Sequence, residues 1–256
     1  MGEAYIVDAI RTPVGKRGGG LAEEHPADLG AHAIKGLIDR TGIDPLAVDD
    51  VIMGCLDNMG PQAGDIARTA WLAAGMPEAV PGVTVDRQCG SGQQAVSFAA
   101  MGVMSGVQDI VVAGGMQNMS LIPIGSAMDV MSHETIGHPE IEDPYSTSKG
   151  WVARYGTQEV SQFRGAELIA KKWGLSRGEL EEFALESHER AARAQDEGRF
   201  DNEILPYGEV TQDEGVRRGT TLEKMAQLSP LEEDGVITAA VASQISDGAV
   251  ALMIAG

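Results

Sequence analysis

Over its first 118 residues the sequence alternates short β-like apolar runs with segments of helical spacing, and this alternation restricts the fold more than any other feature. The expected strands cover residues 4–8, 51–53, 83–85 and 109–113, and the expected helices cover residues 27–40, 65–74 and 93–105. Such alternation predicts an α/β fold in which helices pack on a layered sheet. The helix expected over 93–105 is apolar on nearly every side, which indicates a buried helix in the middle of the fold.

The regular alternation is lost near Ser120, where Met, Pro, Ser, His and Gly dominate the next 35 or so residues. Further on, Ser176-Arg177-Gly178-Glu179 forms a capping box, which predicts a helix that runs to about Glu197 and ends at Gly198. A second helix is expected before it, over residues 161–173. These patterns predict an inserted and mostly helical domain.

A wholly apolar strand is expected at residues 249–255, and its pattern matches the first sheet better than the insertion. We therefore expect a discontinuous α/β domain made of residues 1–119 and 243–256. The inserted domain then covers residues 120–242.

Composition narrows the range of functions. A formal net charge of −19 repels phosphate backbones, so nucleic acid is not expected as a partner. No apolar run approaches the ~18 residues of a membrane span, and the start of the chain lacks a signal-peptide pattern, so a cytoplasmic protein is expected. The 2 cysteines are too few for a disulfide framework, and neither has metal-ligand spacing with a histidine, so no metal site is expected.

Residues 83–95 place Cys89 on a sharp turn between an expected strand and an expected helix. The positive end of a helix favours a thiolate, and Gly90 and Gly92 allow substrate atoms to approach the backbone. The alternative is a core cysteine beside a glycine-lined helix start, and position alone does not decide between the two. Cys55 ends an apolar strand and is expected to be a packed core thiol.

Five segments in order resemble the thiolases, a family of coenzyme A-dependent acyltransferases. The segment Arg87-Gln88-Cys89-Gly90-Ser91-Gly92 resembles the family's nucleophile motif. The others are residues 8–16, 113–120, 220–226 and 246–249. Gln117 and Asn118 depart from the family's usual Gly-Gly-Met-Glu-Ser-Met-Ser strand end.

The resemblance implies a mixed five-stranded sheet with helices on both faces and an inserted loop domain. It implies that Cys89 attacks the 3-keto carbon of a 3-ketoacyl-CoA and that its backbone N–H stabilises the oxyanion. Coenzyme A and acyl-CoA are then substrates, with no covalently bound cofactor. A homodimer or tetramer acting in fatty acid β-oxidation, or in the reverse condensation of acetyl-CoA, is the corresponding expectation.

The resemblance also indicates where coenzyme A binds. Arg217 falls where the family stacks an arginine on the adenine, and Ser243 falls where the family bonds the pantetheine. Biosynthetic members carry His-Met where Ser161 and Gln162 stand, so the segment from 161 to 165 is more similar to degradative members.

A complete thiolase resembles two copies of one α/β unit, and its second copy carries a catalytic histidine, an acid-base cysteine and an Asn-Glu-Ala-Phe motif. None of these occurs in the sequence. Gly137-His138-Pro139 resembles the histidine motif but lacks its later glycine, and the histidines are all interpreted as non-catalytic: His25, His32, His133, His138 and His188.

We therefore expect an inactive N-terminal fragment in which the all-apolar helix is partly uncovered. The alternatives are a non-catalytic module that binds coenzyme A or a partner, and one subunit of a split enzyme.

Overall fold

A computed structural model describes residues 2–129 and 144–256, and it divides the chain into two compact units. The first unit comprises Met1–Ala127, Phe200–Gly215 and Ile245–Gly256. The second comprises Met128–Arg199 and Val216–Gln244. His133 and His138 lie outside the described residues.

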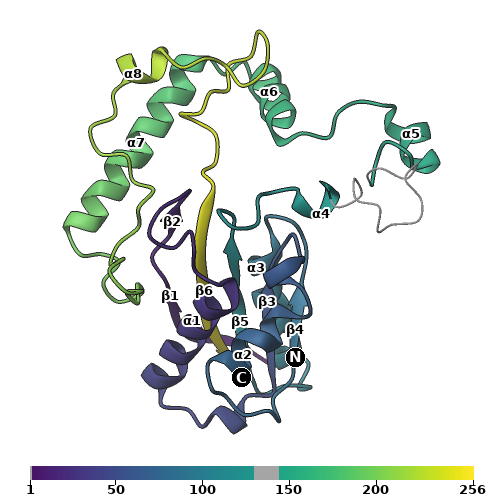
Figure 1. The fold of residues 1–256 in the computed structure, drawn as a ribbon, viewed down its shortest axis with the longest axis vertical. Helices are drawn as coiled ribbons and strands as arrows, with labels where there is room; N and C mark the ends of the chain where they lie inside the picture. Colours follow the sequence, from purple (N-terminus) through teal and green to yellow (C-terminus); the bar gives the residue numbers. More distant parts are fainter. Residues whose placement is uncertain (1, 130–143) are drawn as a thin grey trace. The chain divides into compact units, whose positions relative to one another are not determined.

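The first unit contains a mixed sheet whose main path has the order β1-β6-β5-β3-β4 (Figure 1). The strands are β1 (Tyr5–Arg11), β3 (Asp50–Gly54), β4 (Gly82–Val85), β5 (Ile110–Asn118) and β6 (Ser246–Ala255). β6 pairs antiparallel with both β1 and β5, whereas β3 pairs parallel with β4 and β5. The two-residue strand β2 (Gly15–Lys16) also pairs with β6. The expected mixed five-stranded sheet is confirmed, with β2 as a short addition.

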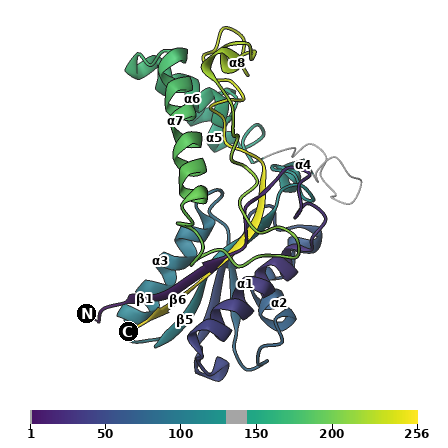
Figure 2. The same cartoon turned by 90° about the vertical axis from the view of Figure 1, so that its left-hand side faces the viewer.

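Helices cover both faces of this sheet (Figure 2). On one face α1 (Pro26–Thr41) and α2 (Ile66–Ala73) pack over a core that includes Leu37, Trp71 and Met253. On the other face, α3 (Ser91–Met104) packs over a smaller core. Two short 3-10 helices, η1 (Pro45–Ala47) and η2 (Gly60–Gln62), lie in the connections.

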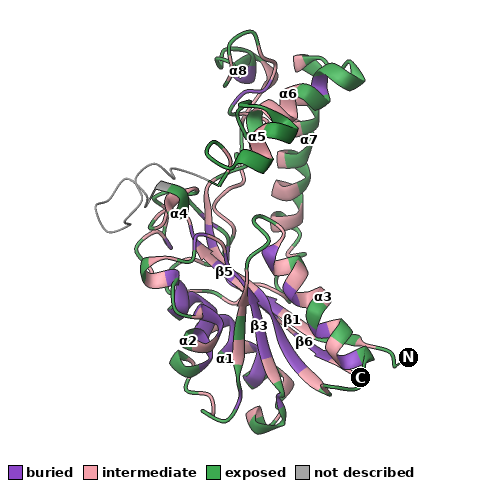
Figure 3. Cartoon of the chain, turned by 90° about the vertical axis from the view of Figure 1, so that its right-hand side faces the viewer, coloured by how far each residue is buried: buried purple, intermediate pink, exposed green. Residues whose placement is uncertain are grey.

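The outer face of α3 is open. Ala95, Ala99 and Val103 face the sheet and are buried, whereas Phe98 is 42% exposed and Met101 is 60% exposed. Figure 3 shows the exposed residues along this helix. The prediction of a helix buried on all sides is therefore wrong for this chain, because a single layer covers α3. The expectation that the apolar helix is partly uncovered is confirmed.

Segment Phe200–Gly215 belongs to the first unit, although sequence patterning places it in the insertion. Arg11 on β1 holds it through ion pairs, with Nε 2.8 Å from Glu203 and Nη1 2.6 Å from Asp213. The same Asp213 carboxylate accepts the Val14 N–H at 2.8 Å. Periodicity does not reveal such pairings between residues distant in sequence.

The second unit is mostly helical. It contains α5 (Lys149–Tyr155), α6 (Gln162–Trp173), α7 (Arg177–Asp196) and α8 (Leu222–Ala226), and α4 (Ser126–Asp129) begins in the first unit and ends in the second. The predicted capping box opens α7, because the Ser176 N–H donates to Glu179 at 2.8 Å and the Glu179 N–H donates to Ser176 Oγ at 3.3 Å. Within the described residues, no helix is both long and apolar enough to cross a membrane.

Candidate active site around Cys89

Cys89 lies on the turn between β4 and α3, at the edge where the parallel strands end. β4 ends at Val85, and Gly90 is the N-cap residue of α3, so Cys89 directly precedes the N-cap residue. The Cys89 side chain is exposed. Among the described residues no hydrogen bond of normal geometry leaves the Cys89 backbone N–H, and Cys89 forms an isolated β-bridge with Arg87. The expected position of Cys89 between a strand and a helix is therefore found in the structure.

The turn is strained at the residue before the cysteine. Gln88 has a φ of 48°, in the left-handed region that costs a non-glycine residue about 1–2 kcal/mol. The Gln88 N–H donates to the Asp86 carboxylate at 2.8 Å, and the Gly90 N–H donates to Arg87 O at 3.1 Å. Strain of this kind persists only where the surroundings fix the backbone, and it is concentrated at functional sites.

Glycines let the start of α3 lie directly against the sheet. A Cβ at Gly54, the last residue of β3, would lie 2.3 Å from Gly92 N and 2.3 Å from Ser91 C. A Cβ at Gly115 on β5 would lie 2.8 Å from Gly54 O. This contact of backbone on backbone fixes the height of the Cys89 turn above the strand ends. No sequence pattern indicates this role of Gly54.

Cys55 is buried, whereas Cys89 is exposed. Cys55 is 2% exposed, and its Sγ lies 3.5 Å from Gln117 Oε1. Burial, together with the nearby carboxylates of Asp86 and Asp57, raises the pKa of Cys55 to about 12. The prediction of a packed core thiol is confirmed, and this thiol stays protonated at neutral pH.

The two departures from the family motif occupy structural positions. Gln117 accepts the Leu56 N–H at 3.1 Å and donates to Gln62 at 3.2 Å, and Gln62 is fully buried. Asn118 donates to the carbonyl of Glu24 at 2.8 Å. These bonds fasten the end of β5 to the neighbouring loops.

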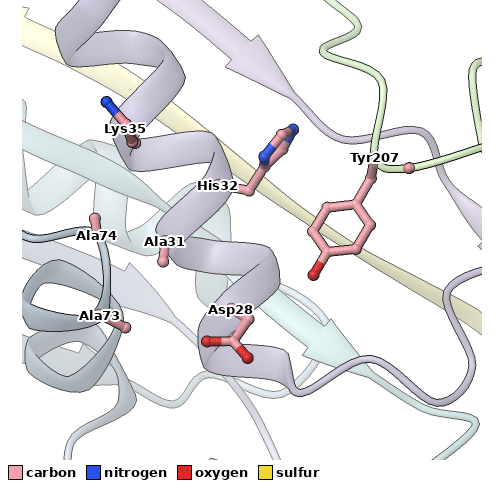
Figure 4. Close-up of a pocket in the computed structure, with 8 residues that line it drawn as sticks. Asp28, Ala31, His32, Lys35, Ala73, Ala74 and Tyr207 are labelled. Atoms are coloured by element: carbon pink, nitrogen blue, oxygen red, sulfur yellow. The ribbon is translucent and has the colours of Figure 1, made fainter.

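Two of the described histidines, His25 and His32, bond to residues outside the Cys89 turn. His25 caps α1 by accepting the Ala27 N–H at 3.2 Å. His32 Nε2 lies 2.9 Å from Pro206 O, and its ring meets Tyr207 edge-on with 5.0 Å between ring centroids. Figure 4 shows these two rings beside a pocket of about 380 Å³, whose lining residues do not include Cys89.

Arg217 and Ser243 lie in the second unit, and both are exposed. The Arg217 backbone N–H donates to His188 Nδ1 at 3.3 Å, and within the described part of the chain its guanidinium has no partner. Burial, and then the charge of Arg217, lower the pKa of His188, which keeps this acceptor neutral. The adjacent Arg218 is instead paired with Asp196 at 2.8 Å. Of the two arginines, Arg217 is therefore the one available to a ligand.

Comparisons with known proteins identify relatives of the whole chain. The family model described as the N-terminal domain of thiolase matches residues 4–256. A steroid 3-ketoacyl-CoA thiolase, FadA6, from Mycobacterium tuberculosis is 61% identical over 259 residues, which cover 100% of this chain and 62% of the relative. A β-ketoadipyl-CoA thiolase from Escherichia coli is 37% identical over 273 residues, which cover 100% of this chain and 66% of the relative.

A solved structure gives the same result for the fold. The crystal structure of an acetyl-CoA acetyltransferase from Bacillus anthracis superposes with a TM-score of 0.82 at 32% identity. The match covers 100% of this chain and 66% of that chain. The chain thus spans just under two thirds of the length of these relatives.

Proposed function

This chain belongs to the thiolase family, and from that premise we propose that it supplies the nucleophile of a 3-ketoacyl-CoA thiolase. The observation that carries the proposal is the contrast between its two thiols. Cys89 is exposed on a fixed turn at the start of a helix, whereas Cys55 is buried with a raised pKa. Only a thiol in the first environment is suited to nucleophilic attack.

In the proposed reaction the Cys89 thiolate attacks the 3-keto carbon of a 3-ketoacyl-CoA. The bond between carbons 2 and 3 then breaks, acetyl-CoA leaves as an enolate that takes up a proton, and the shortened acyl group remains on Cys89. The thiol of free coenzyme A attacks this thioester and releases an acyl-CoA. We expect the Cys89 backbone N–H to bond the oxyanion of each tetrahedral intermediate.

Coenzyme A is expected to bind the second unit of the chain through Arg217 and Ser243. A protein with a net charge of −19 needs local donors to hold the phosphates, and the Arg217 guanidinium has no partner within the described residues. Ser243 is likewise exposed. Both positions match residues that the family uses for this cofactor-like substrate.

For the substrate we propose degradative thiolysis within lipid breakdown. The segment from Ser161 to Gly165 is similar to that of degradative thiolases, and Ser161 caps α6 by accepting the Phe163 N–H at 3.2 Å. The 61% identity to a relative named as a steroid 3-ketoacyl-CoA thiolase favours a bulky, steroid-derived acyl group among its substrates.

We propose that a second α/β unit completes the site. Phe98, Met101 and Met104 on α3 expose a continuous apolar face, and on the edge strand β1 Ile6 is 61% exposed. A face of this kind is normally covered. We expect the remaining acid-base groups to come from the same unit, since the described histidines bond to other residues: His25 to Ala27, His32 to Pro206 and His188 to Arg217.

The nucleophile assignment is tested by limited alkylation of the native chain with iodoacetamide at about pH 8, followed by peptide mapping. We expect the adduct on Cys89, because Cys55 with its pKa of about 12 remains a buried thiol. A Cys89→Ala variant should then take up no reagent until the protein is unfolded. Preferential labelling of Cys55 in the native protein would contradict the proposal.

The coenzyme A site is tested by calorimetric titration of coenzyme A into the native chain. Arg217→Ala is expected to weaken binding by about 1–3 kcal/mol, the scale for losing a charge-assisted contact. Arg190→Ala is the matched control, because Arg190 is an exposed arginine of the same unit that already pairs with Glu186. Equal losses in the two variants would mean that Arg217 contributes only general charge.

A further inference from the structure

We propose that the Ser91 hydroxyl is a positioning group for the nucleophile, and that it acts by holding Gln88 in its left-handed conformation. The inference rests on the proposed role of Cys89 and concerns how the turn that carries this residue is fixed. A closed set of hydrogen bonds surrounds Cys89.

Ser91 bridges the two residues that precede the cysteine. Its Oγ accepts the Arg87 N–H at 2.9 Å and donates to Gln88 O at 2.5 Å. The Ser91 backbone N–H donates to the same Gln88 carbonyl at 3.0 Å. Ser91 is 4% exposed, so its hydroxyl is buried, and a buried hydroxyl left without a partner is costly. One side chain therefore ties residues 87 and 88 to the first residue of α3, and Cys89 lies inside the loop.

The direction of these bonds separates this role from helix capping. A serine near a helix start commonly accepts N–H groups of the first turn. In α3 the N-cap residue is Gly90, which has no side-chain cap, and the Ser91 hydroxyl bonds backward to Arg87 and Gln88. The hydroxyl thus supports the turn and contributes nothing to the helix cap.

The hydroxyl holds Gln88, which is the strained residue of the turn. Gln88 has a φ of 48°, which a glutamine adopts only when other contacts compensate. Asp86 secures its N–H at 2.8 Å and Ser91 secures its carbonyl, so both of its peptide groups are fixed. Ser91 has no room to shift in response, because its backbone packs against Gly54. A Cβ added at Gly54 would lie 2.3 Å from the Ser91 carbonyl carbon. Without the hydroxyl, only the Ser91 backbone N–H would hold the Gln88 carbonyl, and Gln88 would relax and carry the Cys89 side chain and N–H with it.

The test measures the rate of Cys89 alkylation by iodoacetamide in the native 256-residue chain. Ser91→Ala is expected to slow labelling about five- to tenfold, the effect of losing a hydrogen bond that holds the turn. Combining it with Gln88→Gly should restore the rate to within about threefold of wild type, because glycine adopts a positive φ without cost. Ser97→Ala is the matched control, since the Ser97 hydroxyl bonds to Gln93 O at 3.0 Å within α3.

Buried Cys55 reports folding in every variant, because its labelling signals an opened core. If Ser91→Ala exposes Cys55, the comparison passes to Ser91→Thr and Ser91→Val, which have nearly equal shape and differ in the hydroxyl. The threonine variant should then react at least fivefold faster than the valine variant. Equal rates in that pair, a wild-type rate in folded Ser91→Ala, or no recovery with Gln88→Gly would each overturn the inference. Failure of wild-type Cys89 to react ahead of Cys55 would instead refute the nucleophile assignment itself.

Discussion

The 256-residue chain purified alone is expected to cleave acetoacetyl-CoA at least about 10²–10⁴-fold more slowly than the same chain assembled with the second half of a close relative. The reason lies in the protons of the reaction. Cys89 must lose a proton, the leaving enolate must gain one, and the incoming coenzyme A thiol must be activated. Each well-placed acid-base group is worth about 10²–10⁴ in rate. His25 caps α1, His32 contacts Pro206 and His188 accepts the Arg217 N–H, so none of the described histidines bonds to Cys89.

The rates are measured by the loss of the acetoacetyl-CoA enolate absorbance, for the chain alone and for the chain co-expressed with the second-half polypeptide. Cys89→Ala in the assembled protein is the control and should remove the activity. Robust turnover by the chain alone, abolished by Cys89→Ala, would show that one of its own histidines serves as the base.

The second large effect is expected from Gly54→Ala. The added Cβ would lie 2.3 Å from backbone atoms of Ser91 and Gly92, and no rotamer change can relieve a clash with backbone. We expect a loss of about 3 kcal/mol in the free energy of unfolding, at the upper end for overpacking. In the assembled enzyme, the displaced turn should also lower kcat about 10²-fold, because a shift of ~1 Å at a reacting group has that cost.

Urea unfolding of the native chain measures the first effect, and Gly165→Ala is the control. A Cβ at Gly165, inside α6, meets nothing within 4 Å, so this variant should be more stable by about 0.5–1 kcal/mol. Gly54→Ala with unchanged stability and unchanged kcat would mean that the start of α3 does not depend on its contact with β3.

Local patterns in the sequence predicted most of the fold. The capping box at Ser176 and the αL residue Gly42, with a φ of 67°, mark helix ends through contacts within a few residues. The wholly apolar run at residues 249–255 indicates a strand of the first sheet, because a central strand is apolar on both faces. In the structure this run lies in β6. These signals are visible because neighbouring residues determine them.

Features that depend on distant contacts were not visible. The pairing of Arg11 with Glu203 and Asp213, which brings Phe200–Gly215 to the first unit, joins residues about 200 positions apart. Composition indicated that the helix over 93–105 was buried, but the open outer face of α3 depends on what covers it.

At the candidate site, the motif located Cys89, but the hydroxyl bridge of Ser91 and the close approach at Gly54 required coordinates. The assignment of coenzyme A to Arg217 and Ser243 stays a prediction.

The most direct test of the central claim, that Cys89 carries the acyl group, is mass spectrometry of the assembled protein after acetoacetyl-CoA is added without free coenzyme A. Lacking the second thiol substrate, the reaction should stop at the acyl-enzyme, so peptide mapping should find one acetyl group, on Cys89. Adding coenzyme A should remove it and yield acetyl-CoA. An acetyl group on another residue, or turnover without any adduct on Cys89, would contradict the account.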